Sequence, residues 1–297
     1  YGFNSDQVNG LEIVLPTGEV CRFGSCALGV SWFTNHPLPD IGLFFGWCGT
    51  TGIVTKLSIR LYPARKIRGF GQFVVDDENL VPEIIGKITR TQMAEDIIAY
   101  SRAIPPFGMG LQHFTVNIGA DSEKELEFKQ ELIWDDTLGE YITSGVGGYL
   151  GFTRGLERPQ ISKTSDYKKG GGFEYVGSIM PIEKYPECYR RGREISERHH
   201  IPYTVTGRCV GVGHSMMFAW TYAFNRADPR SIQHSRDALH ETDDLVMELG
   251  GVIWKPGTYG QRIVRDRLDP NTRALMRRIK DALDPAGIMN PGNWEGL

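Results

Sequence analysis

One glycine-rich stretch decides the fold of this chain: Leu43-Phe44-Phe45-Gly46-Trp47-Cys48-Gly49-Thr50-Thr51-Gly52-Ile53-Val54-Thr55-Lys56. An apolar run leads into three glycines with hydroxyl residues between them, and a second β-prone run follows over residues 53–61. Glycines let a backbone approach a ligand closely, while threonine hydroxyls and free amides offer hydrogen-bond donors. A loop of this kind between two strands suits the phosphates or ring edge of a large cofactor. A plain turn is nevertheless the commoner use of such residues, so the flanking segments decide between the two interpretations.

A β-hairpin is predicted ahead of this stretch. Leu11, Ile13 and Leu15 alternate with other residues, which is typical of a strand with one buried face. Pro16-Thr17-Gly18 then makes a turn, and a return strand follows it. Residues 1–63 are therefore predicted to be β-rich and to contain no convincing helix.

After Pro63 the pattern of apolar residues changes, and it predicts strands that alternate with helices. Strands are predicted over residues 70–74, 113–118, 175–182, 203–210 and 216–224, and helices over residues 80–88, after an N-cap at Asp121, and over residues 184–199 and 231–249. This alternation, with one direct strand pair, predicts an antiparallel sheet with helices on one face. Residues 135–172 are loop-rich, and we interpret Lys168–Gly172 as a surface loop or lid, because its spacing does not match a phosphate-binding loop.

The C-terminal region carries clear helix signals. Asp269 is the predicted N-cap, Pro270 occupies the first helical position, and Asp284-Pro285 ends the helix. Residues 286–292 then turn the chain sharply.

Three of these segments occur in an order that resembles a known family. They are Gly10-Leu11-Glu12-Ile13-Val14-Leu15-Pro16-Thr17-Gly18, the Gly46–Thr55 loop, and Asp284-Pro285-Ala286-Gly287-Ile288-Met289-Asn290-Pro291-Gly292. Together they resemble the FAD-linked oxidases of the vanillyl-alcohol oxidase / p-cresol methylhydroxylase superfamily, which includes glycolate oxidase and D-lactate dehydrogenase flavoproteins. The resemblance implies an α+β fold, with the latter half of a p-cresol methylhydroxylase-type FAD-binding domain in residues 1–63. It implies a ferredoxin-like, antiparallel-sheet cap domain for the substrate in residues 64–250, and a C-terminal segment, residues 251–297, that returns to the flavin domain.

The same resemblance implies a further part of the protein. The family's first FAD subdomain, which holds the pyrophosphate, is expected ahead of Tyr1, as another part of the polypeptide or as a partner chain. We expect the present chain alone not to bind FAD tightly.

The family pattern also implies which residues contact the cofactor FAD: Cys48, Gly49, Thr50, Thr51, Gly52, Ile53, Val54 and Asn290. Many members have Ser-Glu where this chain has Trp47-Cys48, a change that preserves a backbone contact but not a side-chain role. Asn290 has an alternative interpretation as a simple turn former.

A metal site is not predicted. Glycolate- and lactate-type members carry a G-H-x-G-D-G-N-x-H motif and a downstream E-H-G motif, which together bind a divalent metal. Here only His214 of Gly213-His214-Ser215-Met216 matches, and one histidine is a poor metal site. His214 is instead a candidate base or covalent flavin attachment point, with a structural histidine as the alternative.

Four further residues complete the candidate site. Tyr259 and Arg262 are assigned catalytic roles because they follow the Gly250-Gly251 turn, where the family places residues that face the substrate. Lys255 and Arg208 are cations that could anchor an anionic substrate, with exposed surface charge as the alternative.

The resemblance implies an FAD-dependent enzyme that transfers a hydride from an alcohol or 2-hydroxy acid to the flavin. The alternatives are oxidation of a 4-alkylphenol and a non-catalytic or electron-transfer subunit. A net charge of -3 argues against nucleic-acid binding, and no apolar run is long enough to cross a bilayer. The five cysteines lack metal-binding spacing and indicate free thiols in a reducing cytoplasm. A small-molecule substrate, an electron-acceptor protein and a homo-oligomer are the expected partners.

Overall fold

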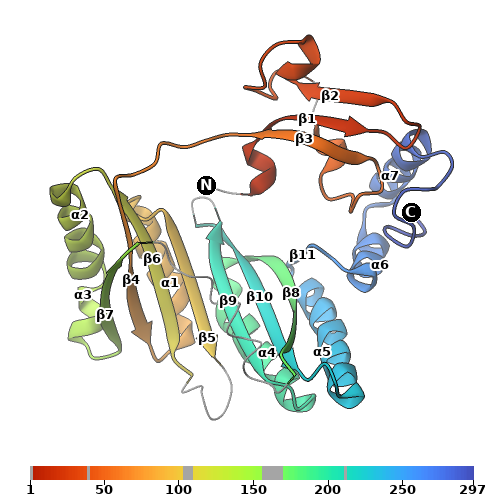
Figure 1. Ribbon diagram of the computed structural model, residues 1–297. Helices are drawn as coiled ribbons and strands as arrows, with labels where there is room; N and C mark the ends of the chain where they lie inside the picture. The colour runs from red at the N-terminus through yellow and green to blue at the C-terminus, as the bar shows by residue number, and fades with distance from the viewer. Residues whose placement is uncertain (1–2, 39–40, 103–109, 156–169, 211–212) are drawn as a thin grey trace. The chain divides into compact units, whose positions relative to one another are not determined.

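The computed structural model describes residues 3–38, 41–102, 110–155, 170–210 and 213–297, and the chain forms two compact units (Figure 1). The large unit consists of Ala64–Trp254. The small unit consists of Gly2–Pro63 together with Lys255–Leu297. The small unit is therefore built from two segments that lie far apart in the sequence.

The large unit contains an eight-stranded antiparallel sheet in the order β11-β8-β10-β9-β5-β6-β4-β7 (Figure 1). Its strands are β4 (Ile67–Val75), β5 (Asp96–Arg102), β6 (Gln112–Ala120), β7 (Gly147–Arg154), β8 (Gly172–Pro181), β9 (Tyr203–Val210), β10 (Ser215–Phe224) and β11 (Val252–Trp254). Its α-helices are α1 (Val81–Thr91), α2 (Glu123–Gln130), α3 (Gly139–Thr143), α4 (Tyr185–Arg198) and α5 (Pro229–Glu248). A π-helix (Glu131–Thr137) follows α2, and 3-10 helices precede α1 (Glu78–Leu80) and α4 (Ile182–Lys184). The expected α+β class with an antiparallel sheet is confirmed.

The core of the large unit lies between the sheet and its helices. Alternate residues of β10 are fully buried, and they include Trp220 and Tyr222. The Trp220 indole donates a hydrogen bond to the Cys188 carbonyl of α4 over 3.0 Å, and the Tyr222 and Thr242 hydroxyls lie 2.7 Å apart, which connects the sheet to α5. Met217 and Ala219, which alternate with these residues, are on the opposite face and are only partly buried, whereas Thr221 and Ala223 further along that face are buried. The period of two in this strand thus separates a helix-covered face from a second face.

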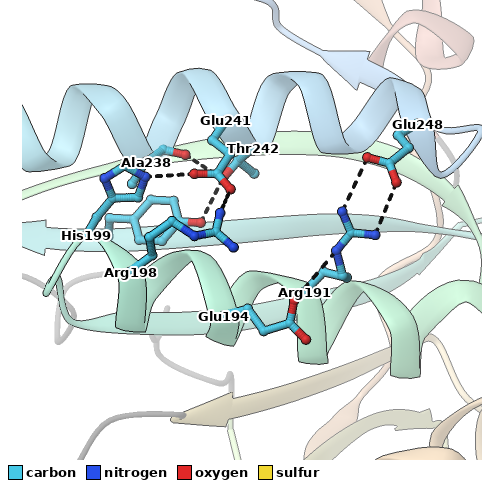
Figure 2. A network of polar contacts seen from close by, with 9 residues as sticks. Arg191, Glu194, Arg198, His199, Ala238, Glu241, Thr242 and Glu248 are labelled. Atoms are coloured by element: carbon cyan, nitrogen blue, oxygen red, sulfur yellow. Dashed lines mark hydrogen bonds and ion pairs between the residues drawn. The ribbon is translucent and has the colours of Figure 1, made fainter.

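Polar contacts also join α4 to α5 (Figure 2). Arg191 pairs with Glu248 at 3.1 Å, and the His199 ring nitrogen lies 2.7 Å from the Glu241 carboxylate, which also pairs with Arg198. Burial lowers the pKa of His199, so its contact with Glu241 is a hydrogen bond from a neutral ring at neutral pH. Exposed pairs of this kind contribute little to stability.

The small unit is organised around a three-stranded antiparallel sheet in the order β2-β1-β3. Its strands are β1 (Val8–Val14), β2 (Val20–Gly24) and β3 (Ile53–Ile59). Its α-helices are α6 (Thr258–Arg267) and α7 (Pro270–Leu283). Three 3-10 helices complete the unit: Asn4–Gln7, Ser25–Leu28 and Ile41–Phe44. A compact apolar cluster is formed by Val8, Leu11, Ile13 and Ile41, with Leu15, Phe23, Phe44 and Phe45 packed against it. The predicted hairpin is present.

Glu12 is a buried carboxylate in the middle of this small sheet. It accepts hydrogen bonds from Arg22 on β2 at 3.0 Å and pairs with Lys56 on β3 at 2.9 Å, while Thr55 donates to it at 3.2 Å. The hydrogen bonds from Lys56 and Arg22 lower the pKa of Glu12 to about 2. One carboxylate therefore connects all three strands.

The structure corrects several sequence-based expectations. The apolar run before the glycine loop is not a strand, because Ile41–Phe44 forms a 3-10 helix. The N-cap of α2 is Ser122, whose hydroxyl accepts from the Glu125 amide at 3.2 Å, whereas Asp121 binds Arg65. Residues 135–172 were expected to be loop-rich, yet they contain α3 and β7; Lys168 and Lys169 lie outside the described residues.

The buried carboxyl of Asp243 on α5 predicts an unusual pH dependence. Burial, reinforced by Asp244, raises the pKa of Asp243 to about 7, against 3.8 for an ordinary aspartate. Between these values the unfolded chain has lost the proton that the folded chain keeps, so stability should fall as the pH rises from about 4 to about 7. We expect Asp243→Asn to remove this dependence and to stabilise the chain at pH 8 by roughly 1 to 4 kcal/mol. Denaturant unfolding at several pH values measures both effects.

The exposed Asp136 provides the control. Asp136→Asn should leave the pH dependence of unfolding as it is in the parent protein. If Asp243→Asn behaves like this control, Asp243 does not carry a proton in the folded chain.

Candidate functional site

The glycine-rich loop, residues 46–52, follows the 3-10 helix Ile41–Phe44 and leads directly into β3. Three of its residues have left-handed backbone conformations: Gly46 (φ 76°), Cys48 (φ 51°) and Gly49 (φ 74°). Glycine adopts such angles without strain, but Cys48 does so only where the surroundings impose them. Contacts from elsewhere in the small unit must therefore hold this loop.

The C-terminal segment supplies these contacts to alternate carbonyl groups of the loop. The Trp294 indole donates to the Gly46 carbonyl at 3.0 Å, and the Lys280 ammonium donates to the Thr50 carbonyl at 2.8 Å. Between them, the Asn290 side-chain amide donates to the Cys48 carbonyl. Three side chains from α7 and the following turn thus hold the carbonyls of residues 46, 48 and 50.

The opposite edges of these peptide groups carry N–H donors. In a trans peptide the carbonyl of one residue and the amide of the next point in opposite directions, so the amides of Trp47, Gly49 and Thr51 point away from the C-terminal segment. None of these three amides donates a hydrogen bond to another residue that the structure describes. Trp47 and Thr51 are buried residues, whereas Gly49 is exposed. The Gly49 amide is therefore the N–H donor on the exposed part of the loop, which suits a ligand with acceptor atoms.

The threonine hydroxyls, in contrast, are occupied within the loop. The Thr50 hydroxyl donates to the Trp47 carbonyl at 2.7 Å, and the Thr51 hydroxyl donates to the Leu43 carbonyl at 2.9 Å. Gly52 is required by packing, because a side chain there would lie 2.7 Å from the Ile13 side chain. The backbone amides of residues 47, 49 and 51, rather than the hydroxyls, are thus the loop donors that no other described residue uses.

Asp284 anchors the C-terminal turn to α7. Its side chain is fully buried and pairs with Lys280, and it accepts hydrogen bonds from the amides of Ile288 at 3.0 Å and Met289 at 2.9 Å. Burial raises the pKa of Asp284, but the Lys280 ammonium and these two amides outweigh it and hold the pKa below its usual range. Lys280, which also binds the loop, is therefore fixed by a charged partner.

Tyr259 and Arg262, the predicted catalytic residues of the small unit, both lie on α6. Arg262 is more than half exposed and lies 3.6 Å from the Glu295 carboxylate. Lys255 precedes α6 in a left-handed conformation. Of the predicted cofactor contacts, Ile53 and Val54 begin β3 with exposed side chains. The structure thus brings Asn290 together with the loop at Cys48 and Gly49, and places the other small-unit candidates on or next to α6.

His214 and Arg208 belong to the large unit. His214 lies in the turn between β9 and β10, next to Gly213, which approaches Thr89 at the end of α1. Arg208 on β9 forms two hydrogen bonds with the Asp96 carboxylate of β5, at 2.9 and 2.6 Å. A substrate anion would therefore have to share or displace Asp96 to reach this guanidinium.

No metal centre or membrane helix is found in the described parts of the chain. Residues 3–38, 41–102, 110–155, 170–210 and 213–297 contain no group of three His, Cys, Asp or Glu side chains suited to a metal ion. None of the helices within these ranges has the length and apolar character that a bilayer crossing requires.

Comparisons with known proteins identify the class. Residues 171–294 match the family described as FAD linked oxidases, C-terminal domain. The 4-ethylphenol oxidase from Gulosibacter chungangensis has a similar structure (TM-score 0.79, 20% identity, covering 98% of this chain and 66% of that one). So does p-cresol methylhydroxylase with substrate bound (TM-score 0.78, 17% identity, covering 99% and 67%). Residues 171–294 therefore match the C-terminal domain of FAD-linked oxidases, and the chain has the fold of the p-cresol methylhydroxylase type.

Sequence relatives agree with this class. An uncharacterized FAD-linked oxidoreductase from Mycobacterium tuberculosis is 27% identical over 98% of this chain. A D-lactate dehydrogenase from Archaeoglobus fulgidus is 24% identical over 98% of this chain. In both cases the chain spans about 65% of the relative's length. The expected cofactor, FAD, is confirmed by the match to FAD-linked oxidases and by the FAD-linked oxidoreductase relative, and a loop amide that donates to no described residue fits its acceptor-rich groups.

Sequence reasoning missed the residues that hold the loop. Lys280, Trp294 and Gln261 each contact it, and Asp284 fixes Lys280. The only local signal was the Asp284-Pro285 helix stop, which does not reveal that the carboxylate is buried.

The buried Asp284 predicts a specific loss of stability. Asp284→Asn keeps the shape of the side chain but removes the charge that Lys280 and two amides share, and should destabilise the small unit by about 2 kcal/mol. Urea unfolding measures the loss, and hydrogen exchange should locate it in residues 284–294.

Asp281→Asn is the matched control, because Asp281 is an exposed carboxylate on the same helix. A cost for Asp284→Asn no larger than that of Asp281→Asn would show that the carboxylate does not organise the turn.

Proposed function

We propose that this chain is the larger part of an FAD-dependent oxidoreductase that takes a hydride from an alcohol or 2-hydroxy acid. In this proposal residues 1–63 and 251–297 bind the flavin, and residues 64–250 form the cap that binds the substrate. The observation that carries the proposal is the conformation of the loop at residues 46–52. Side chains of the C-terminal segment bind the carbonyls of residues 46, 48 and 50, whereas the amides of residues 47, 49 and 51 donate to no other described residue. The match to FAD-linked oxidases supports the identity of the ligand.

Bound FAD supplies the redox chemistry by accepting a hydride, so the protein needs only to orient the cofactor and substrate and to manage a proton. The amides of Gly49 and its neighbours are assigned to cofactor acceptor atoms. His214 is assigned as the base that takes the proton of the substrate hydroxyl. Arg208 and Lys255 are assigned to an anionic group of the substrate, and Tyr259 and Arg262 to positions near the reacting carbon.

The second candidate is oxidation of a 4-alkylphenol. Two structures with this fold are named for such phenols, 4-ethylphenol oxidase and p-cresol methylhydroxylase. The metal-binding motif of lactate-type members is also replaced here, since only His214 of it remains. The D-lactate dehydrogenase relatives support the hydroxy-acid alternative.

A third candidate is a flavoprotein subunit that has lost catalysis and only transfers electrons. The same loss of the metal motif motivates it. The absence of flavin from the assembled protein would contradict the first two candidates and favour a non-catalytic subunit, whereas bound flavin that no substrate reduces would favour an electron-transfer subunit.

The remaining flavin-binding portion is the first proposed partner. The relatives are longer than this chain, and β3 carries exposed apolar side chains that a further subdomain or partner chain could cover: Ile53, Val54, Leu57 and Ile59. An electron-acceptor protein, self-association into a homo-oligomer and a cytoplasmic location are further proposals, the last of them based on the cysteine residues. The five unpaired cysteines are compatible with a reducing compartment.

Flavin spectroscopy tests the proposal. We expect the complete protein to show a flavin absorption spectrum that bleaches when the correct substrate is added without an acceptor. A panel of 2-hydroxy acids and 4-alkylphenols separates the two candidate substrate classes, because only one class should bleach the flavin quickly. Protein purified without flavin, and unable to take up added FAD, would contradict the proposal.

The role of His214 has its own test. His214→Ala should slow flavin reduction by about 10²- to 10⁴-fold if this residue is the base, while flavin binding is retained. His234→Ala is the control, because His234 is an exposed histidine on α5. An unchanged rate of flavin reduction in His214→Ala would exclude a catalytic role for this side chain.

A further inference from the structure

The buried side chain of Gln261 is a second connection between the C-terminal segment and the loop. It lies on α6 and is only 3% exposed. Its amide nitrogen donates to the Pro256 carbonyl at 3.0 Å and to the Asn293 side-chain oxygen at 2.9 Å, and it lies 3.5 Å from the Cys48 sulfur. Its oxygen accepts from the Trp294 amide at 2.6 Å. A single side-chain amide therefore joins α6, the C-terminal turn and the loop.

Both the nitrogen and the oxygen of the Gln261 side chain are needed to satisfy the groups around it. The nitrogen faces two acceptor oxygens and a sulfur, and the oxygen faces a backbone donor, so only a side chain with a donor and an acceptor satisfies the site. Burial raises the pKa of the Cys48 thiol, which keeps this neighbour of Gln261 neutral. The Gln261 side chain is thus buried and neutral, and both its nitrogen and its oxygen have hydrogen-bond partners.

Gln261 acts on the loop from two directions. It contacts the Cys48 side chain directly, and it holds the backbone of Trp294, whose indole donates to the Gly46 carbonyl. Gly46 and Cys48 are two of the loop residues with left-handed backbone conformations. Such angles at a non-glycine residue persist only when the surroundings over-determine them.

We propose that Gln261 is a positioning residue that sets the direction of the loop's peptide groups and makes the loop and the C-terminal turn change conformation together. With Gln261 in place, the carbonyls of residues 46, 48 and 50 face the C-terminal segment, and the amides of residues 47, 49 and 51 face the opposite side. The value of this arrangement to FAD binding rests on the proposed function, but the coupling itself does not.

Hydrogen exchange in the flavin-free chain tests the coupling. Gln261→Met keeps the length and removes both polar ends. The informative amide is Thr50, which donates to the Trp47 carbonyl at 3.0 Å and touches no atom that the substitution removes. We expect its exchange to become about fivefold faster, the factor that corresponds to loss of one hydrogen bond worth about 1 kcal/mol. Amides of β4 to β10 should not change.

Two variants provide controls. Gln233→Met removes an exposed glutamine of α5, which pairs with Asp237, and should leave Thr50 exchange at the parent value. Trp294→Phe removes the indole donor to Gly46 and its hydrogen bond with the Cys48 thiol, and should also accelerate Thr50 exchange. This variant remains informative if Gln261→Met does not fold. Unchanged Thr50 exchange in Trp294→Phe and in any folded Gln261→Met protein overturns the proposal.

A flavin titration of the complete protein separates this inference from the proposed function. If Gln261→Met accelerates Thr50 exchange and weakens FAD binding, as followed by flavin fluorescence, both proposals are supported. Accelerated exchange in a protein that never binds FAD would support the coupling and contradict the flavoprotein assignment. Weakened FAD binding without faster exchange would support the flavoprotein assignment and contradict the coupling.

Discussion

The Lys280 ammonium is the contact on which the architecture of the small unit depends. It donates to the Thr50 carbonyl, 230 residues earlier in the chain, and pairs with the fully buried Asp284 carboxylate. Asp284 in turn holds the amides of Ile288 and Met289, which direct the chain into its final turn. A charge pair in a buried place is stabilising only when its remaining hydrogen bonds are satisfied, and here they are. The glycine loop and the C-terminal turn therefore depend on the same few polar atoms.

The contacts from the C-terminal segment explain why some N–H groups of the loop have no partner among the described residues. A backbone group that is neither paired nor hydrated is costly, so a flexible loop would turn its N–H groups inward or into water. Here Trp294, Asn290 and Lys280 bind the carbonyls of residues 46, 48 and 50. Because the peptide groups are trans, this fixes the direction in which the amide of the next residue points. Preorganised donors of this kind lower the entropic cost of binding an acceptor-rich cofactor.

The large unit is held together in a different way. Its sheet buries aromatic side chains such as Phe218 and Trp220 against α4, and the exposed ion pairs between α4 and α5 add little stability.

Arg208 illustrates the limit of assigning roles by residue type, because a cation proposed for a substrate also serves as a cross-strand partner of Asp96. Strands β5 and β7 escaped prediction for different reasons. The apolar residues of β5 are consecutive, so they show no period of two, and β7 contains three glycines among few apolar residues.

The sequence by itself determined the elements with strong local signals. The helix Pro270–Leu283 begins and ends where its Asp269 cap and Asp284-Pro285 stop predicted, and the order of three motifs was enough for the fold class and the cofactor. Only the tertiary structure decided which atoms of the loop are available. The Thr50 and Thr51 hydroxyls, attractive donors in the sequence, bind carbonyls within residues 43–47, whereas the backbone amides remain. The reason is physical: local preference depends on neighbours in the chain, but the direction of a peptide group here is set by Lys280, Asn290 and Trp294, more than 200 residues away.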